Sequence, residues 1–196
     1  MPITNLPQNI QNKYEINEFR HAVSILQYDF PQEFQDVVDV LNNFVLKKSD
    51  ILAAGGRKSP IADKFDNYLY NRGWVEHKFD TALIIDGLQK DSPTHKIDCY
   101  KNRIALDIEW NNKDPFFDRD LNNFRLLHER DAISVGIIVT RCSNLQIIFN
   151  SLGKGSSYGA STTHMNKLLP RILGGSGGGC PILVFGITNN LYNPLL

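Results

Sequence analysis

The chain has 196 residues, enough for one domain with a sizeable core, and its hydrophobic fraction of 42% and aromatic fraction of 10% exclude a disordered protein. The 21 basic and 21 acidic residues cancel, which argues against a protein that simply coats nucleic acid. No apolar run reaches the roughly 18 residues of a membrane span, and the first ten residues do not resemble a signal peptide, so we expect a cytoplasmic protein without a membrane partner.

The three cysteines, Cys99, Cys142 and Cys180, are odd in number and far apart, which suits buried, reduced thiols. Charge is unevenly distributed along the chain. After Asp131 there is no acidic residue, whereas four basic residues follow: Arg141, Lys154, Lys167 and Arg171. This part of the chain either forms a positive surface that faces phosphates or carries a chance imbalance, and the sequence leaves both open.

Apolar periodicity predicts helices and strands in the first half of the chain. Ser59 followed by Pro60 suits the start of a helix, and Gly73 suits its end. The expected order is a polar arm over residues 1–13, a helix with Phe19, Ala22, Val23 and Leu26, a helix after Pro31 with Phe34, Val37, Leu41 and Phe44 on one stripe, a loop over 47–58, the helix from Ser59, a continuous or broken strand over 74–85, and a polar loop over 87–95.

The second half alternates between strands and helices. The expected order is a hairpin over 97–110, a loop with Pro115, a helix over 119–130, a strand over 133–140 buried on both faces, a short strand over 146–149, a loop over 153–164, a helix with Met165, Leu168, Leu169 and Ile172, a glycine-rich segment over 174–179, and a last strand over 182–187. This alternation predicts a single α/β domain over residues 1–196, with a central mixed β-sheet flanked by helices.

Carboxylates gather on one face of the hairpin. From Ile104 to Trp110 apolar residues alternate with Ala105, Asp107 and Glu109, which is the period of a strand. Asp98 lies nine positions before Asp107, and a turn through Lys101 and Asn102 would bring it beside that face. Three converging carboxylates repel each other unless a cation lies among them, and oxygen ligands suit Mg²⁺. Acidic pairs are also common on solvated strand faces, so spacing alone does not decide.

The same segment, D-C-Y-K-N-R-I-A-L-D-I-E-W-N-N-K from Asp98, resembles the active-site segment of type II restriction endonucleases of the BglII/BstYI group. These belong, with BamHI, to the PD-(D/E)XK nuclease superfamily. Four further blocks resemble that group in the same order: R-H-A-V-S-I-L from Arg20, S-P-I-A-D-K-F-D-N-Y-L-Y-N-R-G-W from Ser59, A-I-S-V-G-I-I-V from Ala132 and C-P-I-L-V-F-G-I from Cys180. The resemblance covers most of the chain and implies a restriction-endonuclease-like fold.

The resemblance implies an active site. Asp98 and Asp107 match the two metal-binding carboxylates, helped by the backbone carbonyl of Ile108, with one or two Mg²⁺ ions per site. Asp107 departs from the glutamate that these relatives carry. Glu109 matches a position filled by lysine in most of the superfamily, by glutamine in the BglII/BstYI group and by glutamate in BamHI. A glutamate there can accept a proton from water or bind a metal, and the sequence leaves both roles open.

Two segments are candidates for contact with double-stranded DNA. By the resemblance, the loop with Asn111, Asn112 and Lys113 and the following helix with Asn123 would enter the major groove, where amides and ammonium groups suit purine edges. The second segment, over 154–164, carries Lys154, Ser156, Ser157 and Tyr158. An ordinary loop with a serine or threonine capping the next helix is the alternative. Arg57 and Lys58 are weaker candidates for phosphate contacts.

The resulting hypothesis is a type II restriction endonuclease. It would hydrolyse phosphodiester bonds of a short DNA palindrome with Mg²⁺ as a homodimer, because two-fold sites call for two-fold proteins. By family analogy the helix over 119–130 is the expected dimer surface. The alternatives are a structure-specific repair nuclease of the same fold and a catalytically silent DNA-binding domain.

Overall fold

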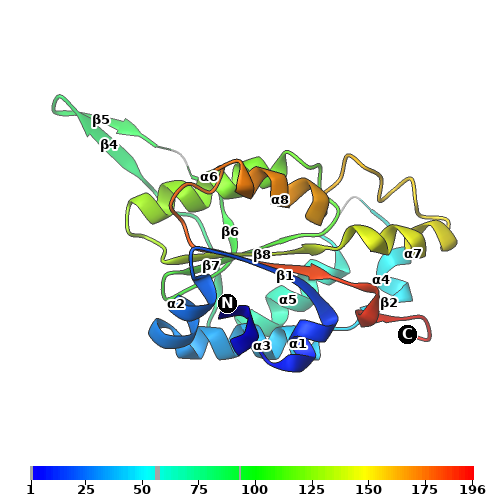
Figure 1. The fold of residues 1–196 in the computed structure, drawn as a ribbon. Coiled ribbons are helices and arrows are strands. Elements are labelled where there is room, and N and C mark those ends of the chain that lie inside the picture. Colours follow the sequence, from blue (N-terminus) through cyan, green and yellow to red (C-terminus); the bar gives the residue numbers. More distant parts are fainter. Residues whose placement is uncertain (1, 56–57, 93) are drawn as a thin grey trace.

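The computed structural model describes residues 2–55, 58–92 and 94–196. A six-stranded mixed sheet with the order β1-β9-β8-β7-β6-β3 forms the centre (Figure 1). Its strands are β1 (Tyr14–Phe19), β3 (Val75–His77), β6 (Ile97–Lys101), β7 (Ile104–Glu109), β8 (Val135–Arg141) and β9 (Ile182–Ile187). The three central strands β7, β8 and β9 run parallel, and β1, β6 and β3 pair antiparallel to their neighbours. The expected α/β architecture with a central mixed sheet is confirmed.

Helices cover both faces of the sheet (Figure 1). One face packs against α6 (Phe116–Glu129) and α8 (Met165–Leu173). The other packs against a larger set: α1 (Gln8–Lys13), α2 (Ala22–Asp29), α3 (Pro31–Asn43), α4 (Lys48–Leu52), α5 (Pro60–Tyr70) and α7 (Gln146–Ser151). The alternation predicted for β7 is confirmed, because Ile104, Leu106 and Ile108 belong to the larger core and Ala105 to the smaller one.

Two local features explain where α5 begins and how closely α6 packs on the sheet. Ser59 caps α5, since its hydroxyl accepts a hydrogen bond from the Ala62 amide at 3.1 Å, and Pro60 occupies the first helical position as the sequence predicted. On the other face, Gly136 of β8 lies against the ring of Phe124 from α6, and a β-carbon there would overlap that ring. Glycine therefore lets α6 approach the sheet closely.

The β6–β7 hairpin turns at Asn102 and Arg103, whose φ angles are 44° and 71°. Two consecutive positive φ angles suit a tight hairpin turn, and asparagine tolerates that conformation better than most residues. Cys99 pairs with Leu106, and the same register continued by one residue places Asp98 opposite Asp107. The turn lies one residue later than the predicted Lys101 and Asn102, and it brings the two carboxylates to one place as predicted.

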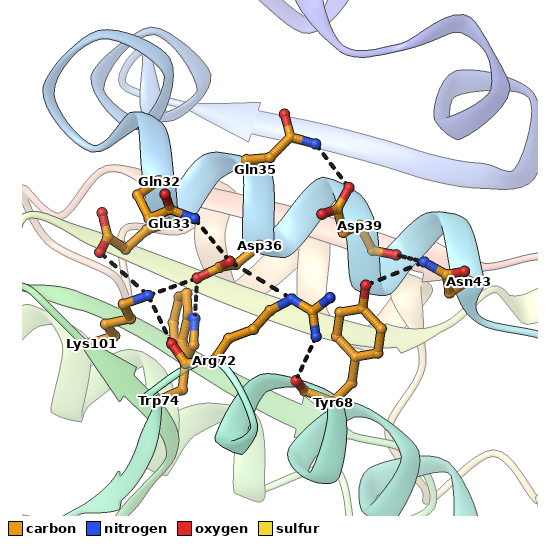
Figure 2. A network of polar contacts seen from close by, with 10 residues as sticks. All are labelled: Gln32, Glu33, Gln35, Asp36, Asp39, Asn43, Tyr68, Arg72, Trp74 and Lys101. Atoms are coloured by element: carbon orange, nitrogen blue, oxygen red, sulfur yellow. Dashed lines mark hydrogen bonds and ion pairs between the residues drawn. The ribbon is translucent and has the colours of Figure 1, made fainter.

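A buried polar network ties α3 to the turn end of this hairpin (Figure 2). Asp36 accepts hydrogen bonds from Trp74 Nε1 at 3.0 Å and from Lys101 Nζ at 2.8 Å. Lys101 also donates to the carbonyl of Arg72 at 2.9 Å. Asp36 is buried, and its charge is compensated by the lysine that ends β6.

Smaller elements complete the chain. β4 (Ala82–Ile85) and β5 (Leu88–Asp91) form a hairpin that projects from the body, and each of its strand residues is exposed (Figure 1). β2 (Leu46–Lys47) pairs with β10 (Tyr192–Asn193). Three short 3₁₀ helices are η1 (Pro2–Asn5), η2 (Ser143–Leu145) and η3 (Asn189–Leu191). Among the described residues no helix has the length and apolarity to cross a bilayer.

Several predicted elements were wrong. Residues 1–13 are not an arm but contain η1 and α1, and β1 includes Phe19, which the pattern had assigned to a helix. β1 is an edge strand with mostly half-buried side chains, so its apolar signal is weak. The expected strand over 146–149 is the helix α7, because a short apolar run does not distinguish the two. The predicted loops over 47–58 and 87–95 contain α4 and β5.

Candidate active site

Asp98 and Asp107 are joined through backbone amides of the hairpin. The amide of Asp98 donates to Asp107 Oδ1 at 2.9 Å, and the amide of Ile108 donates to Asp98 Oδ2 at 3.0 Å. Each carboxylate accepts a hydrogen bond from a backbone amide of the facing strand, and these two bonds restrict the rotation of both side chains. The structure brings together the two residues that the sequence predicted as metal ligands.

A fourth carboxylate, which sequence analysis missed, comes from α6. Asp120 is 1% exposed, its Oδ1 accepts from Arg119 Nε at 2.8 Å, and Arg119 also forms an ion pair with Glu109. A signal for it was present in the sequence. Asp120 lies three residues after Phe117 and four before Phe124, which is the helical spacing of the buried face of α6. An acidic residue on such a stripe indicates a polar site beneath the helix.

Burial and mutual repulsion disfavour the charged forms of all four groups. Burial, followed by the neighbouring carboxylates, raises the pKa of Asp98 to about 6 and that of Glu109 to about 9. The same causes raise the pKa of Asp107 well above its ordinary range, and burial, opposed by Arg119, raises that of Asp120. The Oδ2 atoms of Asp107 and Asp120 are buried and accept no hydrogen bond from the described residues. Arg119, which forms ion pairs with Glu109 and Asp120, contacts neither of these two unpaired oxygens.

This donor set fits Mg²⁺, which takes hard oxygen ligands and often uses only one or two carboxylates together with substrate phosphates. The residues that would hold it are Asp98 and Asp107, whose Oδ2 is unpaired, with the backbone carbonyl of Ile108. Within the described ranges, no three or more acidic, histidine or cysteine side chains form a ready-made cation cage. Non-side-chain oxygens would therefore complete the coordination.

Glu109 is held on both of its oxygens. Arg119 Nη2 contacts Oε1 at 3.2 Å, and Asn112 Nδ2 donates to Oε2 at 2.7 Å. The side chain is only 2% exposed. Of the three carboxylates that the sequence predicted, Glu109 is thus the one whose two oxygens bond to Arg119 and Asn112.

A lysine stands beside Asp98 on the side of α5. Lys58 forms ion pairs with the buried Asp66 and, at 3.7 Å, with Asp63, and its side chain is 48% exposed. Its positive charge acts to lower the pKa of Asp98, against the larger effect of burial. Tyr70 supports the same strand by donating to the Asp98 carbonyl at 2.9 Å. Arg57, the other predicted phosphate contact here, lies outside the described residues.

Asp98 opens into a cleft of about 710 Å³. The cleft brings together segments that are far apart in the sequence, namely the end of β7, the start of α5, the loop after β7 and the loop over 154–158. Of the residues that the sequence singled out, it is lined by Lys58, Asp98, Ile108, Asn111, Asn112, Lys154, Ser157 and Tyr158. Lys58 and Lys154 thus line the cleft into which Asp98 opens.

The two predicted DNA-contacting loops are bonded to each other. Lys113 and Thr162 form an isolated antiparallel bridge. The amide of Asp114 donates to the Ser161 carbonyl at 3.0 Å, and that of Thr163 to the Asn112 carbonyl at 2.9 Å. Neither Ser161 nor Thr162 caps α8, whose N-cap is His164. Exposed side chains on these loops include Asn111, Asn112, Lys113, Ser156 and Ser157.

Two of the predicted DNA-contacting side chains are used within the protein. Asn123 is buried, and its amide exchanges hydrogen bonds with the backbone of His95 at 3.1 and 3.3 Å, so the structure places it away from any DNA-facing surface. Tyr158 is buried and stacks on Phe149 with ring centroids 4.0 Å apart. Its hydroxyl accepts a hydrogen bond from Trp110 Nε1 at 3.3 Å, which anchors the loop to β7.

The three cysteines are free and buried, as expected.

Comparison with known proteins agrees with this arrangement. A family model described as restriction endonuclease BglII/BglIII matches residues 14–187, which include every strand of the central sheet and the carboxylate-bearing hairpin. No curated protein sequence matches the chain. Because the family model spans most of the chain, the protein belongs to the BglII/BglIII family of restriction endonucleases, a family of DNA-cutting hydrolases.

Proposed function

We propose that the protein is a type II restriction endonuclease that hydrolyses double-stranded DNA at a short palindrome with Mg²⁺ as its cofactor. One observation carries this proposal: Asp98, whose carboxylate is hydrogen-bonded within the same hairpin as that of Asp107, opens into a cleft lined by two lysines and by the two loops predicted to contact DNA. Lysines along a cleft suit a polyanionic backbone, and polar loops suit base edges.

Each residue of the site has a role in this reaction. Asp98, Asp107 and the Ile108 carbonyl would hold Mg²⁺, which when bound polarises a phosphoryl oxygen and lowers the pKa of a water molecule. Glu109 would accept a proton from the attacking water, for which it must be charged and free of its present partners. Lys58, beside Asp98, would contact the phosphate next to the bond that is cut, and Lys154 another phosphate.

Base contacts are assigned to Asn111, Asn112 and Lys113 on the loop after β7 and to Ser156 and Ser157 on the second loop. These side chains are exposed, and hydrogen bonds link their loops into one surface. Such a surface can present donors and acceptors to a major groove together. Tyr158 supports the surface from below, and Asn123 is left out of the contact set because its amide is engaged with His95.

We further propose a homodimer, in which two copies of this cleft act on the two strands of a palindrome. The outer side of α6 is the proposed contact surface. Its exposed residues include Asn122 and Glu129, and Arg125 lies between them, bonded to both. Paired side chains of this kind leave few unpaired charges to desolvate when two copies associate.

The decisive experiment is digestion of a long DNA with Mg²⁺ followed by sequencing of the fragment ends. One palindrome at every end is the expected outcome. A smear of unrelated ends would favour a structure-specific nuclease, and intact DNA with Mg²⁺ and with Mn²⁺ would favour a silent DNA-binding domain. The Asp98→Ala variant is the matched control, since any cutting that persists in it comes from another site or a contaminant.

A further inference from the structure

Glu109 is not available for chemistry in the conformation of the free protein. Its two carboxyl oxygens are taken by Arg119 and Asn112. It is 2% exposed, whereas Asp98 lines the cleft. A carboxyl in this position can neither take a proton from water in the cleft nor bind a metal without first losing a partner.

Of these partners, only Asn112 also faces the DNA side. It lines the cleft, and it belongs to the loop assigned to base contacts. Its amide nitrogen lies 2.7 Å from Glu109 Oε2, the shortest contact that Glu109 makes to Asn112 or Arg119. The side chain of Asn112 is exposed, so its amide can meet a base edge from this place. The N–H that Glu109 accepts cannot also donate to a base, so a base that takes this hydrogen breaks the contact to Glu109.

The backbone of Asn112 links this choice to the second loop. Its carbonyl accepts a hydrogen bond from Thr163, and the neighbouring Lys113 bridges to Thr162. Thr162 in turn accepts from the buried Arg141 at 2.8 Å. A shift of either loop on DNA is therefore transmitted to the residue that holds Glu109. The side chain of Asn112 can move without breaking these backbone bonds.

We propose that Asn112 is a positioning and specificity-determining residue that couples base recognition to the chemical step. In the free protein its amide holds Glu109 in the inactive arrangement. On the correct sequence the amide moves to a base, and Glu109 is released toward Asp98 and Asp107. On an incorrect sequence no base contact replaces the Glu109 bond, and the carboxyl stays held. This inference rests on the proposed function and adds a checkpoint to it.

The first test uses Mn²⁺ alone, without DNA, followed by electron paramagnetic resonance. Asn112→Ala should bind Mn²⁺ about tenfold more tightly than the wild type, because one holding contact on Glu109 is gone. Asn112→Gln, which keeps the amide donor, should restore the wild-type affinity. Asn111→Ala removes an amide from the same cleft but no contact to Glu109, so it should leave Mn²⁺ affinity unchanged. Equal affinities for Asn112→Ala and the wild type would overturn the proposal.

The second test measures cutting in a single turnover at saturating enzyme, at the recognised site and at sites changed in one base pair. The rate at the recognised site divided by the rate at a changed site should be at least tenfold smaller for Asn112→Ala than for the wild type. This reduction should be confined to one base-pair position in each half-site. A uniform loss at all sites would contradict the coupling. If Asp98→Ala and Asp107→Ala bound Mn²⁺ as tightly as the wild type, the proposed function itself would fail, and the inference with it.

Discussion

At the scale of single residues, the candidate active site is built from groups whose charges destabilise the free protein. Asp107 illustrates this, since it is 2% exposed, one of its oxygens has no partner among the described residues, and its pKa is raised by burial and by neighbouring carboxylates. Sites with such repulsion are stable only while the rest of the fold compensates, and they are stabilised by a ligand of opposite charge.

Replacement of Asp107 by asparagine separates the metal role from folding. Asp107→Asn keeps an oxygen that can accept from the Asp98 amide but removes one negative charge. Cleavage should fall by at least 10³-fold, since a metal ligand is lost, while affinity for the DNA duplex without divalent ions stays within about threefold. The thermal midpoint of the metal-free protein should rise. Cutting at the wild-type rate would show that Asp107 is not a ligand.

The raised pKa of Glu109 predicts how stability depends on pH. Burial and Asp120 raise this pKa to about 9, from 4.5 in the unfolded chain, so the folded state retains a proton that the unfolded state has released. Stability should therefore fall as pH rises from 4.5 to 9. Glu109→Gln should match the wild type at pH 5 and exceed it by about 1–2 kcal/mol at pH 8.5, which chemical denaturation can measure. A constant difference between the two proteins would contradict this origin.

Lys58 offers a test of the phosphate contact. Lys58→Met removes the ammonium group beside Asp98, whereas Lys58→Arg keeps the charge. If the charge serves the reaction, Met should lower the single-turnover rate about 10- to 100-fold and Arg should recover most of it. A purely structural ion pair with Asp66 would instead lower the thermal midpoint of the Met variant and leave its rate unchanged.

At the scale of elements, the β6–β7 hairpin and the helix α6 supply different residues of the candidate site. The hairpin carries Asp98, Asp107 and Glu109, and its position follows from alternation and a turn. The helix supplies Arg119 and Asp120, which surround Glu109 from the other layer. A strand pattern therefore predicts the first group, but the second depends on how closely α6 approaches β8, where Gly136 meets Phe124.

The β4–β5 hairpin should be dispensable for folding of this chain. All eight of its strand residues are exposed, so it removes little apolar surface from water in the protein as described. Replacement of residues 82–91 by a short glycine linker between Thr81 and Ser92, which are already hydrogen-bonded, should shift the thermal midpoint by no more than about 2 °C. A much larger loss would show that the hairpin is buried against something in solution.

At the scale of the whole molecule, a mixed sheet presents one cleft, while a palindrome requires two. The chain has a mass of 22.2 kDa, so light scattering should give about twice that value if the proposed dimer forms. Opposite-charge substitutions on the proposed surface, Arg125→Glu with Glu129→Arg, should restore association that either single change weakens. A monomer in solution and on DNA would refute the dimer.

The sequence by itself determined the hairpin with its carboxylates, the buried strands and the family, because short-range alternation and ordered blocks of residues are local properties. The helix at 146–151, the first strand and the burial of Asp36 were decided only in three dimensions. The same holds for the site: Asp98 and Asp107 follow from one hairpin, but the places of Asp120, Arg119 and Lys58 beside it arise where separate elements pack. The packing of these elements determines which carboxylate oxygens have no hydrogen-bond partner, and no short sequence pattern encodes that.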